Sequence, residues 1–354
     1  MGKVHWQGQK EVVILLLTIL IGLLAGAVLM AGTGHDWLAG YEYLFKGGVM
    51  SIERAGNTIA TAVPLIFTGL SVAFAFKTGL FNIGAAGQML IGGFCATAVG
   101  LTLDLPKVVL LPAMALAALV SGGLWGAIAG WLKAKYNVNE VVSTIMLNWI
   151  AYWFVYYSVP AYFKGSFETE SRNIPFAASL RTEWLSELFH GSYVNIGVFL
   201  AIGATLLTAF LLQRTTLGFA LKAVGFNPYG AENGGIDSRR CIILSMVIAG
   251  ALSGVGGMTL YCGYGTNLQI GILPSQGFDG IAVALLGANS PWGVMAAALF
   301  FGLLYSGKGF MNAMTSIPPE IADTIIATII YFAATSMLIE KGIARVMKRR
   351  GGGT

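Results

Sequence analysis

The hydrophobic and polar positions along this chain follow one another in long blocks. Apolar runs of roughly 20 residues, the length that a helix needs to cross a bilayer, are separated by connections that carry most of the charged residues. The pattern predicts an all-α fold, a polytopic integral membrane protein with about ten transmembrane helices. The predicted segments lie at about residues 12–31, 58–76, 80–101, 108–132, 140–160, 194–212, 241–263, 278–289, 292–306 and 322–340.

Three of these segments need separate comment. Segment 278–289 is too short to cross alone, and segment 80–101 carries many glycines and two amides, so we expect one or two broken or re-entrant helices. Segment 12–31 follows two lysines, as a cleaved signal peptide would. Its apolar core is longer than the typical core of such a peptide, which favours a retained first span.

Composition supports the bilayer as the solvent for most of the chain. Of 354 residues, 56% are hydrophobic and 10% are charged, against roughly 25% charged residues in a soluble domain. The 48 glycines suit close contacts between helices in lipid. Three cysteines without paired spacing and three scattered histidines predict neither a disulfide framework nor a metal site, and we expect no cofactor.

The distribution of basic residues predicts the orientation. With a cytoplasmic N-terminus, roughly two thirds of the 21 lysines and arginines fall on the cytoplasmic side, as the positive-inside rule requires. Both termini are then cytoplasmic, and the net charge of +5 needs no nucleic acid to explain it. We expect a single transmembrane domain over 1–354, with a long outer connection at 161–193, which includes a short helix within 181–189, and a long inner one at 213–240.

Motifs for catalysis are weak. Residues 302–309 fit the GxxxxGK pattern of a P-loop, but Gly309 replaces the Ser or Thr that holds magnesium, and the stretch ends a membrane segment. Neither a GxSxG elbow nor an HExxH helix occurs. The carboxylates Glu140, Asp279 and Asp323 lie near segment ends, which argues moderately against an ion-coupled transporter. We therefore do not expect an enzyme.

Neutral polar residues within the segments are candidates for a solute route. Such a lining suits a neutral solute that bears hydroxyls or amides. The alternative is ordinary hydrogen bonding between helices, worth about 1 kcal/mol or less for each bond. The candidates for the route are the neutral Asn82, Gln88 and Asn148, together with Gln269, which lies between two segments, and the carboxylate Asp279.

The inner connection 213–240 does not resemble a spacer. Leu217, Leu221 and Val224 recur at helical spacing, Gly225 can end that helix, and Asn227 followed by proline can open a second one. Two short helices with a mixed apolar and basic surface suit the docking of a soluble partner. A helix that rests on lipid would show a similar pattern.

Several of these stretches resemble a known family. Residues 217–231, LGFALKAVGFNPYGA, are similar to the coupling-helix region of inner-membrane permeases of branched-chain amino acid, ribose and nucleoside ABC importers, with Gly230 where alanine is commoner. Residues 79–88, GLFNIGAAGQ, and 277–287, GFDGIAVALLG, agree with the same family. Together with residues 139–148, NEVVSTIMLN, they are most similar to the simple-sugar and nucleoside branch. The resemblance covers roughly residues 55–340.

The resemblance implies a permease subunit that moves nucleosides, or a related neutral sugar-bearing solute, across a bacterial inner membrane. It implies three partners: a second homologous permease, a cytoplasmic ABC ATPase that hydrolyses the ATP, and an external substrate-binding lipoprotein. The residues expected to couple to the ATPase are Leu217, Gly218, Leu221, Lys222, Ala223, Gly225, Asn227 and Ala231. The alternative is a stand-alone secondary transporter or channel for a small neutral solute.

Overall fold

The computed structural model describes the backbone of residues 2–334 and the side chains of residues 16–332. In that range the chain forms helices and loops, and its β-structure is limited to two isolated bridges. The predicted all-α class is confirmed. The chain falls into two compact units. One is Ser51–Gly302, and the other combines the residues before Ser51 with those after Gly302. The single domain that we expect over 1–354 stays a prediction.

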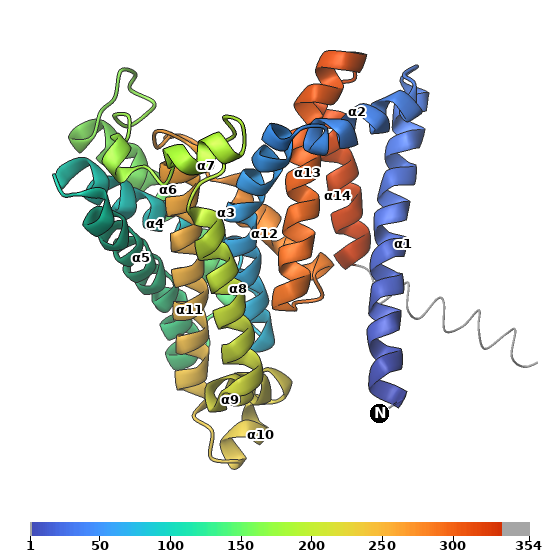
Figure 1. Ribbon diagram of the computed structural model, residues 1–354. Coiled ribbons are helices and arrows are strands. Elements are labelled where there is room, and N and C mark those ends of the chain that lie inside the picture. The colour runs from blue at the N-terminus through green and yellow to red at the C-terminus, as the bar shows by residue number, and fades with distance from the viewer. Residues whose placement is uncertain (1, 335–354) are drawn as a thin grey trace, which may run out of the picture. The chain divides into compact units, whose positions relative to one another are not determined.

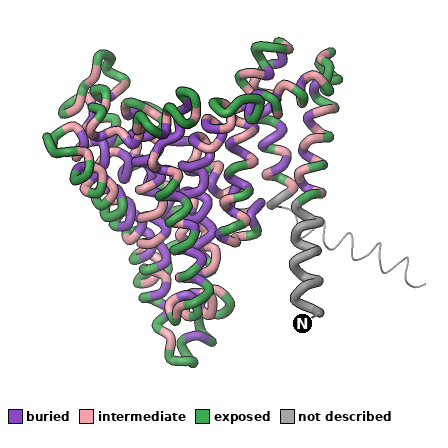
Figure 2. The backbone as a smooth tube through the Cα atoms, in the orientation of Figure 1, coloured by how far each residue is buried: buried purple, intermediate pink, exposed green. Residues whose placement is uncertain are grey.

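The larger unit is built around one buried helix bundle (Figure 1). Helix α11 packs against α5, α4 and α3, and α8 packs against α3. Figure 2 shows that the buried residues gather in the interior of this bundle. Helix α5 differs, because much of it is exposed. The long helices of this unit are α3 (Ile52–Lys77), α4 (Ala85–Thr102), α5 (Lys107–Tyr136), α6 (Glu140–Tyr162), α8 (Gly197–Arg214) and α11 (Ser238–Thr259).

Side-chain caps fix where several of these helices begin. The Ser51 hydroxyl accepts a hydrogen bond from the backbone N–H of Arg54 at the start of α3, at 3.2 Å. Asn139 caps α6 and Asp237 caps α11 in the same manner. Each cap satisfies one of the N–H groups that a helix leaves without a partner in its first turn. The polar residues between the apolar runs thus set the helix boundaries.

A seam of glycines explains why α11 approaches its neighbours so closely. A Cβ atom added to Gly122 of α5 would lie 2.8 Å from the Cα of Gly254 on α11. A Cβ on Gly254 would in turn overlap the backbone of α5 at Ala118, and a Cβ on Gly92 of α4 would overlap Gly254. Small residues let backbones approach in this way inside membranes.

Short helices interrupt the bundle where the sequence predicted irregularity. Residues 80–84 are not helical, and α4 begins only at Ala85. Helix α12 spans 12 residues, about 18 Å, and so cannot cross a bilayer alone. Helix α7 lies within the predicted range 181–189. The short helices are α7 (Glu183–Leu188), α9 (Thr216–Phe226), α10 (Pro228–Asn233) and α12 (Ser275–Leu286).

Six helices in the described part of the chain are long and apolar enough to cross a membrane. The predicted count of about ten is therefore not confirmed. Helix α6 has the length, but it is rich in tryptophan, tyrosine and polar residues, and α12 is too short. The six are Ile52–Lys77, Ala85–Thr102, Lys107–Tyr136, Gly197–Arg214, Ser238–Tyr264 and Pro291–Thr315.

The smaller unit contains α1 (Gly2–Gly32), α2 (Trp37–Val49), the second half of α13 (Pro291–Thr315) and α14 (Pro319–Ala334). Gly22 and Gly26 of α1 lie against isoleucines of α14. The P-loop-like stretch 302–309 lies inside the continuous helix α13, so its backbone is not a loop that could wrap a phosphate. The last part of predicted segment 322–340 lies outside the described residues.

Candidate functional site

Two of the predicted route residues, Asn82 and Gln88, bind each other. The Nδ2 of Asn82 donates to Oε1 of Gln88 at 2.9 Å, and the Nε2 of Gln88 donates to Oδ1 of Asn82 at 3.2 Å. The Asn82 Oδ1 also accepts from the backbone N–H of Gly84. Both side chains are buried. Their hydrogen-bonding groups therefore hold the non-helical segment before α4 in place.

Asn148 on α6 serves the same segment from the other side. Its Oδ1 accepts from the backbone N–H of Gly87 at 2.8 Å, and its Nδ2 donates to the carbonyl of Ile83 at 3.0 Å. The N–H of Gly87 lies in the first turn of α4, where helical partners are missing. For Asn82, Gln88 and Asn148 this geometry supports the alternative of hydrogen bonding between helices.

We expect Asn148→Ala to destabilise the protein by about 2–4 kcal/mol, because it leaves the buried N–H of Gly87 and the partly buried carbonyl of Ile83 without this partner. Thermal unfolding of the purified protein in detergent would measure the effect. Asn173→Ala removes an exposed carboxamide and is the matched control. Equal melting temperatures for the two variants would contradict the structural role of Asn148.

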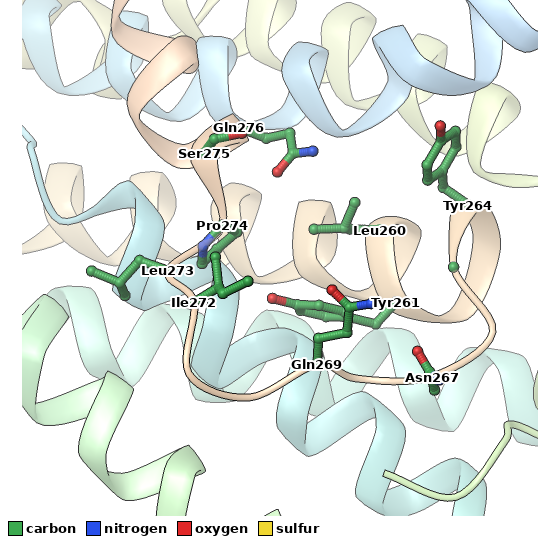
Figure 3. A pocket seen from close by; sticks show the side chains of 11 residues that line it. Leu260, Tyr261, Tyr264, Asn267, Gln269, Ile272, Leu273, Pro274, Ser275 and Gln276 are labelled. Carbon is green, nitrogen blue, oxygen red and sulfur yellow. The ribbon is translucent and has the colours of Figure 1, made fainter. Parts of the chain in front are cut away.

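A pocket of about 310 Å³ lies where α11 ends and α12 begins (Figure 3). Its wall starts on the π-helical turn Leu260–Tyr264, which continues α11, and passes through an extended segment to the first residues of α12. Such π-helical turns occur frequently at functional sites. The lining residues are Leu260, Tyr261, Tyr264, Gly265, Asn267, Gln269, Ile272, Leu273, Pro274, Ser275 and Gln276.

The pocket has a mainly apolar wall with a few neutral polar side chains. None of its eleven lining residues, all in the described part of the chain, carries a charge. Gln269 is a predicted route residue, and the structure places it in the wall. Asp279 lies about one turn into α12, half-buried and outside the lining. Sequence reasoning missed Tyr261 and Gln276, and the amides crowded between residues 267 and 276 were the signal that could have found them.

The long connection 161–193 holds the pocket wall in position. The backbone N–H of Ser171 donates to the carbonyl of Leu268 at 2.9 Å, and the N–H of Ile270 donates to Thr169. The Nδ2 of Asn267 donates to the Glu170 carboxylate at 2.7 Å. An extended wall needs such partners because it has no helical hydrogen bonds of its own. The pocket is therefore built jointly by the end of α11 and residues 169–171.

The predicted pair of short helices in 213–240 is confirmed as α9 and α10. The Thr215 hydroxyl caps α9 by accepting from the N–H of Gly218 at 3.1 Å. Asn227 caps α10 by accepting from Gly230, with Pro228 in the first helical position as expected. Gly225 was expected to end the first helix, but α9 continues to Phe226. A Cβ on Gly225 would overlap the backbone at Lys77, so this glycine instead permits close contact with the end of α3.

The predicted coupling residues divide into a buried and an accessible group. Leu221, Gly218 and Ala231 are buried, and Asn227 is exposed, whereas Leu217, Lys222, Ala223 and Gly225 are half-buried. Leu221 and Val224 pack in an apolar cluster with Phe74 of α3, Leu212 of α8 and Cys241 of α11. The inner face of α9 thus ties the two short helices to three long ones.

Three aromatic side chains cover the outer face of these short helices. Phe226 is 94% exposed, Tyr229 is 80% exposed and Phe219 is 69% exposed. Sequence reasoning missed them because it followed the helical repeat of the buried leucines. Phe219, Phe226 and Tyr229 together make up the aromatic tip of the chain. Exposed apolar side chains, where they form a contiguous patch, are typical of a contact with a partner or a membrane.

The chain is similar to known transport proteins over most of its length. The family of branched-chain amino acid transport system permease components matches residues 54–334. The chain is 41% identical to a nucleoside ABC transporter permease of Lactococcus lactis subsp. cremoris, over 94% of this chain and 93% of that protein. It is 38% identical to a guanosine ABC transporter permease of Bacillus subtilis, over 94% and 96%. It is 32% identical to a glucose ABC transporter permease of Haloferax volcanii, over 95% and 90%. The chain belongs to the family of branched-chain amino acid transport system permease components.

Proposed function

We propose that this chain is a permease subunit of an ABC importer that moves nucleosides into a bacterial cell across its inner membrane. A separate cytoplasmic ATPase would drive it, a second homologous permease would complete the membrane part, and an external lipoprotein would deliver the solute. The names of two relatives, a nucleoside and a guanosine permease, support the substrate class. The glucose permease supports a related sugar-bearing solute as the second candidate.

The observation that carries the proposal is the placement of two different sites at the two ends of α11. Helices α9 and α10 precede its first residue, Ser238 (Figure 1). The pocket begins where α11 ends. At about 1.5 Å for each of its 22 residues, α11 is about 33 Å long, close to the thickness of a hydrocarbon core. A docking surface and a neutral pocket thus fit opposite faces of one membrane.

The packing around α9 supports a mechanism by which the ATPase could act. Its buried face is in contact with α3, α8 and α11, so a push on the aromatic tip would move these helices together. Two packed arrangements of such a bundle can alternate by rigid-body rocking. The chain would then open alternately to each side while ATP is hydrolysed on the partner subunit.

Uptake of radiolabelled solutes by cells with and without this gene tests the proposal. We expect deletion to abolish nucleoside uptake and to leave ribose and glucose uptake unchanged. Loss of sugar uptake with intact nucleoside uptake would contradict the substrate class. Gradient-driven nucleoside flux through the purified chain alone, in vesicles without the ATPase, would instead support a stand-alone transporter.

A further inference from the structure

We infer that the pocket at the end of α11 binds the nucleobase of the solute, through an aromatic ring and two carboxamides. The inference rests on the proposed function, and it assigns to the permease itself a site that recognises the base. Figure 3 shows the carboxamide of Gln269 overlapping the ring of Tyr261 in this view, and Gln276 on the opposite side of the pocket, at the start of α12. The three side chains come from three consecutive segments of the pocket wall.

Tyr261 supplies a surface for stacking. Its side chain is only 8% exposed, yet it lines the pocket. A Cβ on Gly93 of α4 would overlap its ring, so α4 supports the ring from behind. Nucleobases stack on aromatic rings, and loss of one such ring weakens binding by about tenfold or more. The ring is thus held in place, and the small part of it that stays exposed lines the pocket, where a planar ligand can contact it.

Gln269 and Gln276 supply hydrogen bonds to the edge of a base. Neither carboxamide makes a hydrogen bond within the described residues. A carboxamide presents a donor and an acceptor side by side, and the edges of bases present the complementary pair. Asn267 differs, since its Nδ2 donates to Glu170 and its orientation is fixed by the wall. The carboxamides of Gln269 and Gln276 are therefore available for hydrogen bonds to the solute.

The size and charge of the pocket narrow the class of ligand further. Its volume of about 310 Å³ is at the lower end for small-molecule sites, which suits one base with the ribose directed outward. The lining carries no cation that would compensate a phosphate. A nucleotide is therefore disfavoured relative to a neutral nucleoside. A sugar without a base would use neither the ring nor the paired carboxamides.

The test is direct binding of tritiated guanosine to the assembled membrane complex, both permeases with the ATPase, in nanodiscs without the lipoprotein. We expect guanosine to bind and free guanine to compete, whereas ribose and guanosine monophosphate do not. Gln269→Leu and Gln276→Leu should each weaken binding by about tenfold. Tyr261→Leu should do the same, and Tyr261→Phe should bind as the parent does, because it keeps the ring. Asn173→Leu, an exposed carboxamide outside the pocket, is the matched control and should have no effect.

Three results would overturn the inference: no guanosine binding to the parent complex, unchanged binding by both glutamine variants, or competition by ribose as strong as by guanine. Gln269 is exposed, so its variant is not expected to disturb folding. Uptake by whole cells separates the two proposals. If nucleoside uptake requires the gene but the glutamine variants bind and select bases as the parent does, the pocket inference fails and the proposed function stands. If nucleoside uptake does not require the gene, the proposed function fails.

Discussion

Replacing Phe226 and Tyr229 together with aspartate is expected to abolish ATP-driven uptake. Both side chains are almost fully exposed, so the change should leave the bundle folded. Buried aromatic anchors at interfaces contribute about 2 kcal/mol or more each, so the double variant should bind the ATPase about 1000-fold more weakly. Co-purification of the ATPase with the permease, and nucleoside uptake in cells, would measure the two effects.

The matched control for this variant is Phe167→Asp. Phe167 is 68% exposed and lies in the connection 161–193, so it has the same chemistry on another surface. Its variant should retain both the ATPase and uptake. If the aromatic tip rests on lipid instead, the double aspartate variant should keep the ATPase bound at the parent level, and that result would contradict the coupling assignment.

Gly254→Leu is expected to prevent the protein from accumulating in a folded form. A Cβ at this position already overlaps the backbone at Ala118 of α5 and lies 3.0 Å from Gly122, and leucine adds three further carbons. Neither helix can move away without separating α11 from α5 along the whole seam. We expect a cost above about 3 kcal/mol. Size-exclusion chromatography of the detergent-extracted protein would show aggregation and a low yield.

Gly203 of α8 offers the same substitution at an open site. Nothing lies within 4 Å of a Cβ placed on it, and it is exposed. Gly203→Leu should therefore give the parent yield and elution profile, and it should stabilise the helix slightly because glycine costs about 1 kcal/mol there. Equal yields for Gly254→Leu and Gly203→Leu would contradict the close packing of α11 against α5.

The amides of the membrane segments illustrate the limit of sequence analysis. A polar residue inside an apolar run needs a partner, but the run does not say whether that partner is a solute or another helix. Asn82 and Gln88 are six residues apart and bind each other across a non-helical turn, whereas Asn148 reaches the same turn from a helix some 60 positions later. Only the folded chain shows this pairing.

The sequence by itself determined the all-α class, the breaks before α4 and around α12, the short helices α9 and α10, and the family. These features depend on local properties: apolar length, glycine and proline positions, and side-chain caps within a few residues. The tertiary structure decided which residues of α9 face inward, which glycines form the seam, and which neutral side chains surround the pocket. Those outcomes depend on contacts between segments far apart in the chain, such as Tyr261 with Gly93. A periodic pattern along one segment does not show which other segment packs against it in the folded chain.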